Sequence, residues 1–357
     1  MIREAHGSLL EADADALVNT VNTQGVMGKG LALQFKRAYP EMFKEYANAA
    51  KLGQIQLGEM HVWETGTIEG PRFVINFPTK GHWRARSRLA DIERGLESLV
   101  RVIKQLGISS IAVPPLGCGN GGLDWSDVEP RIRAALKDVT GVDVLVFPPG
   151  EAPAAADMRV RTAPPRMTPG RAALIKTLKR YSGVSFGVSL IEVQKLMYFL
   201  QCAGEPLRLN YEKGRYGPYA DNLRHVLSLI ENHYLSGYGD GSKRVREAEP
   251  LVVLPAAEGP ADTVLADHPE TVQRIESVMQ LVEGFESDYG LELLASVHWI
   301  ASNDDPSAAD EVNRAVKLVQ EWTSRKAGMF TQGHITAAWN KLRQTGWLPQ
   351  VTQLPDP

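Results

Sequence analysis

Two asparagines and three glycines near the amino terminus have the spacing of a ligand-binding loop. The segment reads Ala16-Leu-Val-Asn-Thr-Val-Asn22-Thr-Gln-Gly-Val-Met-Gly28-Lys-Gly30. Its apolar start is typical of a buried strand, and a helical pattern begins at Leu31. Because glycine lets backbone N–H groups approach a ligand and a helix N-terminus adds partial positive charge, this junction suits a phosphate or diphosphate. A plain tight turn between strand and helix has the same composition and is the alternative.

A second glycine-rich loop follows another strand-like run. It reads Ser110-Ile-Ala-Val-Pro-Pro-Leu-Gly117-Cys-Gly-Asn-Gly-Gly122-Leu-Asp-Trp. Two such loops, at the carboxyl ends of two strands, can close on one ligand from both sides. Neither loop has the spacing Gly-x-Gly-x-x-Gly or Gly-Lys-Ser/Thr, which disfavours a kinase, a P-loop protein or a dehydrogenase.

Lys80 ends the strand-like segment Arg72-Phe-Val-Ile-Asn-Phe-Pro-Thr-Lys80 and opens a basic stretch, Lys80-Gly-His-Trp-Arg-Ala-Arg-Ser-Arg88. A lysine in a partly desolvated cleft can act as nucleophile or base, or can stabilise negative charge, although most lysines are solvated surface residues. The arginines can neutralise phosphates while Trp83 offers a stacking face, so we expect single-stranded DNA to pass here. The predicted DNA contacts are His82, Trp83, Arg84 and Arg86; a solvated loop is the alternative.

The composition sets limits on these hypotheses. A chain of 357 residues is expected to form two domains of about 150 residues or more. The net charge of -3 means that a nucleic-acid site must be local. Cys118 and Cys202 form no disulfide framework or metal cluster, and no run of about 20 apolar residues occurs. The sequence therefore predicts a cytoplasmic protein outside the membrane, and it indicates neither a metal nor a cofactor.

The elements that must position these residues alternate in type over residues 1–148. Strands are expected at 2–10, 17–20, 59–64, 72–77, 111–114 and 142–147, and helices at 31–39, 42–50, 89–106 and 125–136. Residues 89–106 carry a clear helical period that stops at Gly107. Such alternation favours an α/β fold with a mixed sheet between helices.

The composition changes after this region. Residues 149–170 are rich in proline and alanine and are predicted to be a linker. Residues 171–357 are predicted to be a mainly α-helical domain, with helices at 172–181, 190–202, 219–232, 269–283, 290–302, 309–322 and 334–344.

The motifs Asn19-Thr-Val-Asn22, Gly28-Lys-Gly30 and Pro115-Leu-Gly117-Cys-Gly119, in this order, resemble the macrodomain, the ADP-ribose-binding fold, over residues 1–148. They are most similar to the branch that contains the human terminal ADP-ribose protein glycohydrolase and the DarG antitoxins, which remove ADP-ribose from DNA. The resemblance implies a three-layer α/β/α domain with Lys80 as catalytic residue. The implied ADP-ribose contacts are Ser8, Leu9, Asn19, Asn22, Met27, Gly28, Lys29, Gly30, Thr79, Gly117, Cys118, Gly119, Asn120, Gly121 and Leu123.

Four of these positions need separate comment. The amide of Asn22 suits the ribose beside the scissile bond, but an asparagine here can also form an Asx turn. Gly121 stands where the human relative carries an aspartate, so a lysine–carboxylate pair is in doubt. Ser8 replaces the aspartate that holds adenine in many macrodomains, which implies looser adenine recognition. With no paired histidine evident, Cys118 is expected to line the loop rather than to act as nucleophile.

The second half resembles Panacea-like antitoxin domains in two segments. These are Gln194-Lys-Leu-Met-Tyr-Phe199 and Tyr216-Gly-Pro218. The resemblance implies that residues 171–357 bind a DarT-like ADP-ribosyltransferase toxin. Fifteen Asp or Glu residues lie between residues 245 and 311, against two arginines, and such a surface could occupy the basic DNA groove of the toxin. Ordinary solvated helix faces explain the same charges.

The expected function is an antitoxin that hydrolyses the N-glycosidic bond between ADP-ribose and a base, expected to be thymine, in single-stranded DNA. Its second domain would also bind and neutralise the toxin. The alternatives are a hydrolase of O-acetyl-ADP-ribose or of ADP-ribosylated protein, and a pure ADP-ribose reader with a carboxyl-terminal interaction or dimerisation domain. The basic stretch after Lys80 favours DNA as the substrate.

Overall fold

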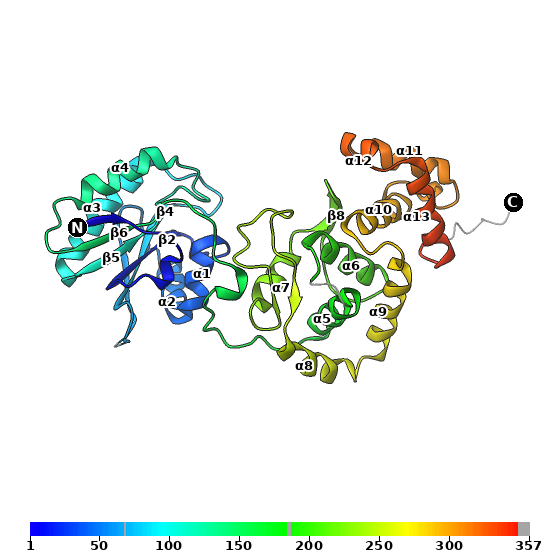
Figure 1. Cartoon of the computed structure of the whole chain (residues 1–357), viewed down its shortest axis with the longest axis horizontal. Helices are drawn as coiled ribbons and strands as arrows, with labels where there is room; N and C mark the ends of the chain where they lie inside the picture. Colours follow the sequence, from blue (N-terminus) through cyan, green and yellow to red (C-terminus); the bar gives the residue numbers. More distant parts are fainter. Residues whose placement is uncertain (68, 184–186, 349–357) are drawn as a thin grey trace. The chain divides into compact units, whose positions relative to one another are not determined.

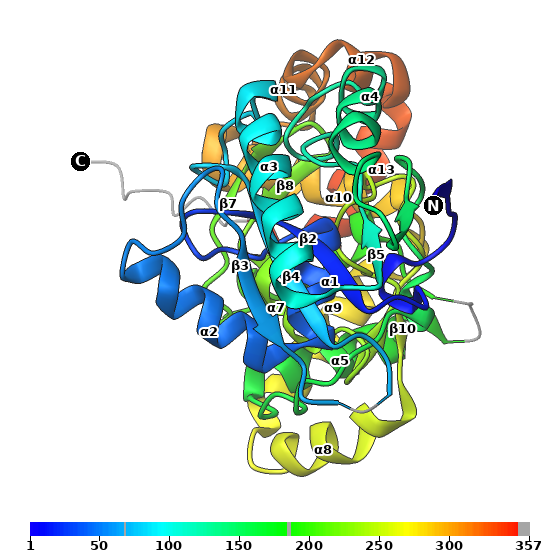
Figure 2. The same ribbon diagram turned by 90° about the vertical axis from the view of Figure 1, so that its left-hand side faces the viewer.

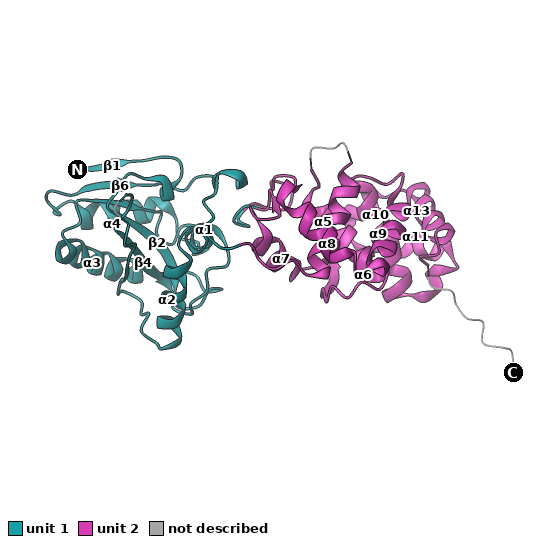
Figure 3. Ribbon diagram, turned by 90° about the horizontal axis from the view of Figure 1, so that it is seen from below, with its two compact units in different colours: residues 1–163, 239–242 teal, residues 164–238, 243–357 magenta. Residues whose placement is uncertain are grey.

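The computed structural model describes residues 1–67, 69–183 and 187–348. The chain divides into two compact units, coloured separately in Figure 3. Unit 1 comprises Met1–Ala163 with the short segment Gly239–Ser242, and unit 2 comprises Pro164–Tyr238 and Lys243–Pro357. Within the described residues, no helix has both the length and the apolar character that crossing a membrane requires.

Unit 1 is built on a six-stranded mixed sheet. Its strand order is β1-β6-β5-β2-β4-β3, and only β3 runs antiparallel to its neighbour. The central strands can be followed in Figure 2. The strands are β1 (Ile2–Glu4), β2 (Ala16–Asn22), β3 (His61–Glu64), β4 (Phe73–Lys80), β5 (Ser110–Val113) and β6 (Asp143–Val146).

Two pairs of helices cover the two faces of this sheet (Figure 1). The pairs are α1 (Gly30–Ala38) with α2 (Pro40–Lys51), and α3 (Leu89–Leu106) with α4 (Trp125–Leu136). Side chains of β2 alternate between them, because Val18 packs with α3 and α4 whereas Leu17 packs with α1 and α2. The expected three-layer α/β/α fold with a mixed sheet is confirmed.

The predicted bounds are most accurate for helices with a long run of regularly spaced apolar residues. The helices expected at 89–106 and 125–136 are found with those bounds. The strand expected at 2–10 ends at Glu4, because Gly7 has a φ of +90° and the 3-10 turn Leu9–Glu11 follows. Strand β4 continues past the expected end at residue 77 and reaches Lys80.

The segment expected to be a linker makes defined contacts. Ala155 is buried in a short 3-10 turn, Ala155–Asp157, and the N–H of Arg161 donates to the carbonyl of Arg37 at 2.9 Å. The first helix of unit 2 begins at Pro169, inside the expected linker, with the Thr168 hydroxyl as its N-cap. The structure places the division between the units at Ala163 and Pro164.

Unit 2 is mainly helical. Its helices are α5 (Pro169–Ser182), α6 (Leu190–Cys202), α7 (Leu223–Ile230), α8 (Pro255–Leu265), α9 (Pro269–Val282), α10 (Asp288–Trp299), α11 (Val312–Trp322), α12 (Ser324–Met329) and α13 (Gln332–Gln344). Two short hairpins join them, β7 (Tyr211–Gly214) with β8 (Gly217–Ala220) and β9 (Leu235–Ser236) with β10 (Val252–Val253). Helices α8 and α12 and both hairpins were not predicted.

The helix predicted at 219–232 is wrong at its start, because Tyr219 and Ala220 belong to strand β8. The Gln194 side chain, on α6, donates to the carbonyl of Ala220 at 3.1 Å and accepts from its N–H at 3.0 Å. The next residue, Lys195, donates to the carbonyl of Pro218 at 2.7 Å. The side chains of Gln194 and Lys195 therefore hold the backbone at Pro218 and Ala220 in an extended conformation. The local helical pattern of the sequence does not predict this strand.

Candidate functional site

Lys80 lies at the carboxyl end of β4, beside the end of β2, where its register partner is Asn22. It is partly buried, and its ammonium donates to the carbonyl of Asn120 at 3.0 Å. Burial lowers the pKa of the Lys80 amine below its usual value. The lysine thus joins the end of β4 to the second glycine loop.

The first loop begins with a turn made by Asn22. Its Nδ2 donates to the carbonyl of Val26 at 2.6 Å, and its Oδ1 accepts from the N–H groups of Gln24 and Val26 at 2.9 and 3.3 Å. This is the Asx-type turn that the sequence allowed as an alternative. An asparagine amide carries two N–H hydrogens, so the turn leaves one for a ribose hydroxyl.

Tyr46 fixes the same loop from α2. Its buried hydroxyl donates to the carbonyl of Asn22, and burial raises the pKa of this tyrosine, which keeps the hydroxyl protonated as a donor. Sequence reasoning missed Tyr46, since its helical spacing marks it only as a core residue.

Several predicted ADP-ribose contacts lie inside unit 1. Asn19 is fully buried, and its Nδ2 donates to Oδ1 of Asn76 at 2.9 Å on the α1–α2 face of the sheet. The same Nδ2 lies 3.9 Å from Sδ of Met27 in the first loop. Buried positions among the other predicted contacts are Leu9, Met27, Thr79, Gly30, Gly117 and Gly121; exposed or partly exposed ones are Ser8, Gly28, Lys29, Cys118, Gly119, Asn120 and Leu123.

The second loop has no room for a side chain at Gly121. A Cβ there would lie 2.3 Å from Oγ of Ser87 and 2.4 Å from the carbonyl oxygen of Gly117. The aspartate of the human relative therefore cannot be accommodated on this backbone. Gly117, with a φ of +75°, is equally confined, since a Cβ would lie 2.9 Å from Leu123.

Cys118 is a neutral thiol in this loop. Burial, with a smaller effect from Asp124, raises its pKa to about 11. Because the thiolate is the reactive form of cysteine, this side chain is a poor nucleophile at neutral pH. A contact of Cys118 with ADP-ribose stays a prediction.

The basic stretch after Lys80 is attached to the second loop. Arg86 donates to the carbonyl of Gly122 at 3.0 Å, and the N–H of Ser87 donates to the carbonyl of Gly121 at 3.0 Å. Arg86, predicted to bind DNA, thus has a structural contact. Ser87 was missed, because nothing in its local sequence marks it.

The exposed end of this stretch is a stack of three side chains. The His82 and Trp83 rings lie 5.5 Å apart and stacked, and the Arg84 guanidinium lies 4.4 Å from the centre of the Trp83 ring. Trp83 is 44% exposed, so part of its ring is open to solvent.

We expect Gly121→Ala to destabilise unit 1 by about 1–3 kcal/mol, because the new methyl group overlaps Ser87 and the Gly117 carbonyl. Gly119→Ala is the matched control, since a Cβ there meets no atom within 4 Å. Urea unfolding followed by circular dichroism compares the two variants. Equal stability of Gly121→Ala and the native chain would contradict the packing described for the loop.

Comparisons with known proteins bear on this geometry. The Macro domain family matches residues 18–132. The chain is 43% identical over 364 residues to the DNA ADP-ribosyl glycohydrolase of Mycobacterium tuberculosis, covering 97% of this chain and 100% of that one. A solved macrodomain of Mycobacterium tuberculosis DarG is 58% identical and covers 42% of this chain and 99% of its own, with a TM-score of 0.42.

The name of another relative joins two activities in one fusion protein. The DNA ADP-ribosyl transferase-DNA ADP-ribosyl glycohydrolase fusion protein of Thermosipho africanus is 36% identical over 143 residues, covering 34% of this chain and 37% of its own. The identity to the mycobacterial protein extends over nearly the whole length of both chains. The chain therefore belongs to the DNA ADP-ribosyl glycohydrolase family of macrodomain proteins.

Proposed function

We propose that this chain hydrolyses the N-glycosidic bond between ADP-ribose and a base of single-stranded DNA. The base that we propose is thymine. The observation that carries the proposal is the position of Lys80, held between two glycine loops and directly followed by an exposed basic and aromatic stretch. The name of the full-length relatives supports it. The two cysteines, neither in a disulfide, fit a reducing cytoplasm as the place of the reaction.

In this reaction water replaces the base at the anomeric carbon. The bond from that carbon to the base nitrogen breaks, a hydroxyl group joins the carbon, and a proton joins the base. The glycine loops hold the diphosphate and ribose, which supplies orientation. If the neutral Lys80 amine attacks the anomeric carbon, the base leaves, and water then breaks the bond between lysine and sugar and releases ADP-ribose. If Lys80 acts as the ammonium, it stabilises charge on the departing base while water attacks the anomeric carbon.

The lowered pKa of Lys80 makes these two roles distinguishable by pH. If the neutral amine reacts, kcat rises as the pH rises toward the pKa of this group, because more of the amine is unprotonated. If the ammonium acts, kcat falls over the same range.

We expect Lys80→Ala to lower the release of ADP-ribose by about 100-fold or more, the usual cost of removing a preorganised charge or nucleophile. The substrate is a single-stranded oligonucleotide with one ADP-ribosylated thymine, and free ADP-ribose is measured. Lys104→Ala, an exposed lysine of α3, is the control. Native release by Lys80→Ala would refute the catalytic role. Release from ADP-ribosylated protein but not from DNA would favour the alternative hydrolase, and binding without release would favour a reader.

The exposed stack His82–Arg84 is the proposed contact with the DNA strand. We expect the double variant Trp83→Ala with Arg84→Ala to weaken binding of the ADP-ribosylated oligonucleotide about 10-fold or more and to reduce its salt dependence, since one stacking face and one phosphate contact are lost. The affinity for free ADP-ribose is expected to stay unchanged. Fluorescence anisotropy at several salt concentrations measures both, with Arg101→Ala as a surface control. Unaltered oligonucleotide affinity would exclude this stack.

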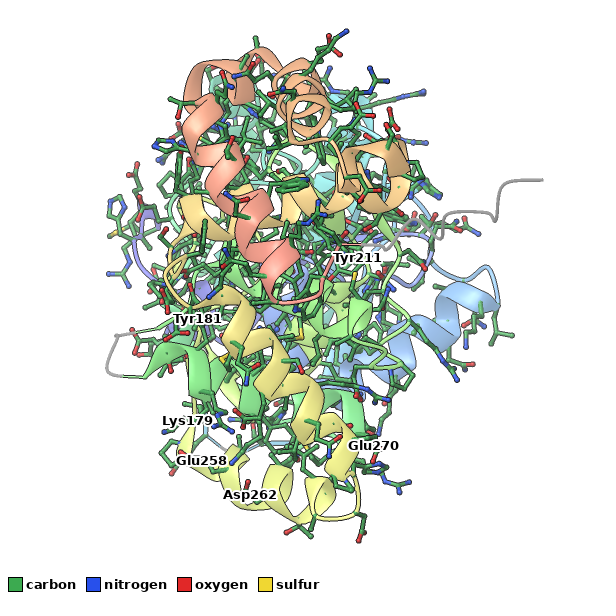
Figure 4. The ribbon with its side chains drawn as sticks, turned by 90° about the vertical axis from the view of Figure 1, so that its right-hand side faces the viewer. Lys179, Tyr181, Tyr211, Glu258, Asp262 and Glu270 are labelled. Carbon is green, nitrogen blue, oxygen red and sulfur yellow. The ribbon has the colours of Figure 1, made fainter. Side chains whose placement is uncertain are left out.

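Unit 2 is the proposed binding domain for a DarT-like ADP-ribosyltransferase. The fusion relative supports a functional link between a transferase and a glycohydrolase of this kind. Nine of the fifteen acids between residues 245 and 311 form ion pairs with a lysine or arginine of unit 2. Figure 4 shows one of them, Glu258 beside Lys179, at 2.8 Å. Most of the expected acidic surface is therefore already neutralised.

Two acidic side chains between α9 and α10 can offer their negative charge to a binding partner. Among the described residues, Glu283 and Glu286 form no ion pair, and both line a surface cavity of about 380 Å³ with Arg180, Tyr181 and Met279. A basic groove of a DNA-modifying toxin would be complementary to this edge.

We expect the double variant Glu283→Lys with Glu286→Lys to slow association with the toxin and to weaken binding by about 10-fold, because charge complementarity acts mainly on the encounter rate. The matched control is Glu258→Gln with Asp262→Gln, whose charges are paired with Lys179 and Lys176. Surface plasmon resonance with the purified toxin gives both rates. Equal effects of the two double variants would contradict a role for this edge.

A further inference from the structure

The pairing of β2 with β4 contains one irregularity, and it lies directly before Lys80. The two strands pair in register from Ala16 with Phe73 to Val21 with Pro78, but the next pair is Asn22 with Lys80. Thr79 is an extra residue on β4, which makes this a β-bulge. Bulges bend a strand and change the direction of the side chains that follow.

The extra residue interrupts the regular alternation of β4 directly before Lys80. Along β4, Val74 and Asn76 point to the α1–α2 face, where Val74 joins that core and Asn76 contacts Met42. An extra residue breaks this alternation for the residues that follow it. Directly after it, the Lys80 ammonium donates to the carbonyl of Asn120 in the second loop at 3.0 Å.

Two threonine hydroxyls hold this irregular backbone. Thr79 is only 4% exposed, and its hydroxyl donates to the carbonyl of Val21 at 3.3 Å, where the ladder is interrupted. Thr23 follows Asn22 and donates from its N–H to the carbonyls of both Lys80 and Gly81, each at 3.2 Å. Its hydroxyl donates to the carbonyl of Gly81 at 2.7 Å.

We propose that Thr79 and Thr23 are positioning residues for the Lys80 amine. Thr79 stabilises the bulge that turns Lys80 toward the second loop, and Thr23 fixes the peptide that follows Lys80. The inference rests on the proposed catalytic role of this lysine. Because a displacement of about 1 Å at a reacting group can cost about 100-fold in rate, loss of either hydroxyl acts on kcat.

This role differs from the ligand contact that the sequence resemblance implied for Thr79. A contact to ADP-ribose that is equal in the ground state and the transition state affects KM and ADP-ribose affinity and leaves kcat unchanged. A positioning role affects kcat and leaves ADP-ribose affinity unchanged. Steady-state kinetics therefore distinguishes a ligand contact from a positioning role.

The test uses the full chain with Thr79→Val and Thr23→Val, which keep the side-chain shape and remove the hydroxyl. We expect kcat for the ADP-ribosylated oligonucleotide to fall about 10-fold or more in each, with KM and ADP-ribose affinity within about 3-fold of native values. We expect Thr23→Ser, which keeps the hydroxyl, to retain most of the native kcat. Thr65→Val is the control, since its hydroxyl makes a similar bond, to the carbonyl of Pro71 at 2.6 Å, away from the site.

Native kcat in both valine variants, or a loss of ADP-ribose affinity with native kcat, overturns the inference. Lys80→Ala, measured in parallel, separates this outcome from failure of the proposed function, because an active Lys80→Ala refutes the lysine's role itself. If Lys80→Ala keeps only a low residual kcat, adding Thr23→Val is expected to leave that residual kcat unchanged, since the hydroxyl acts only through the lysine.

Discussion

The parallel pairing of β2 with β4 is the constraint on which the site depends. It brings the ends of two sequence-distant strands, Asn22 and Lys80, to the same edge of the sheet. The first glycine loop leaves from one strand and the basic stretch from the other. The second loop, from β5, is then joined to β4 and the basic stretch by the Lys80 ammonium, the Arg86 guanidinium and the N–H of Ser87. A shift in this register would separate the lysine from the loops on either side of it.

The sequence predicted the parts of unit 1 that local pattern determines. The helix Leu89–Leu106 repeats its apolar residues over its full length, and both glycine loops follow strands, as expected. It could not predict the bulge at Thr79, because register depends on a partner strand far away in the chain. The hydrogen bond between Asn19 and Asn76 was equally hidden, since Asn76 lies on a strand far away in the chain.

In unit 2 the limits of prediction have a different cause. Gln194 takes the place of a neighbouring strand by bonding to both backbone groups of Ala220, so a short extended segment persists among helices. Composition also overstated the acidic surface, because the lysines and arginines that neutralise it come from outside residues 245–311, as Lys179 and Arg180 do. Charge counts along a chain ignore such pairing across space.

The raised pKa of Cys118 has a consequence for the chemistry that this site can tolerate. Oxidation to sulfenic acid and alkylation both proceed through the thiolate, which is scarce when the pKa is about 11. A sulfur atom can therefore stand in the second glycine loop with low reactivity toward peroxide.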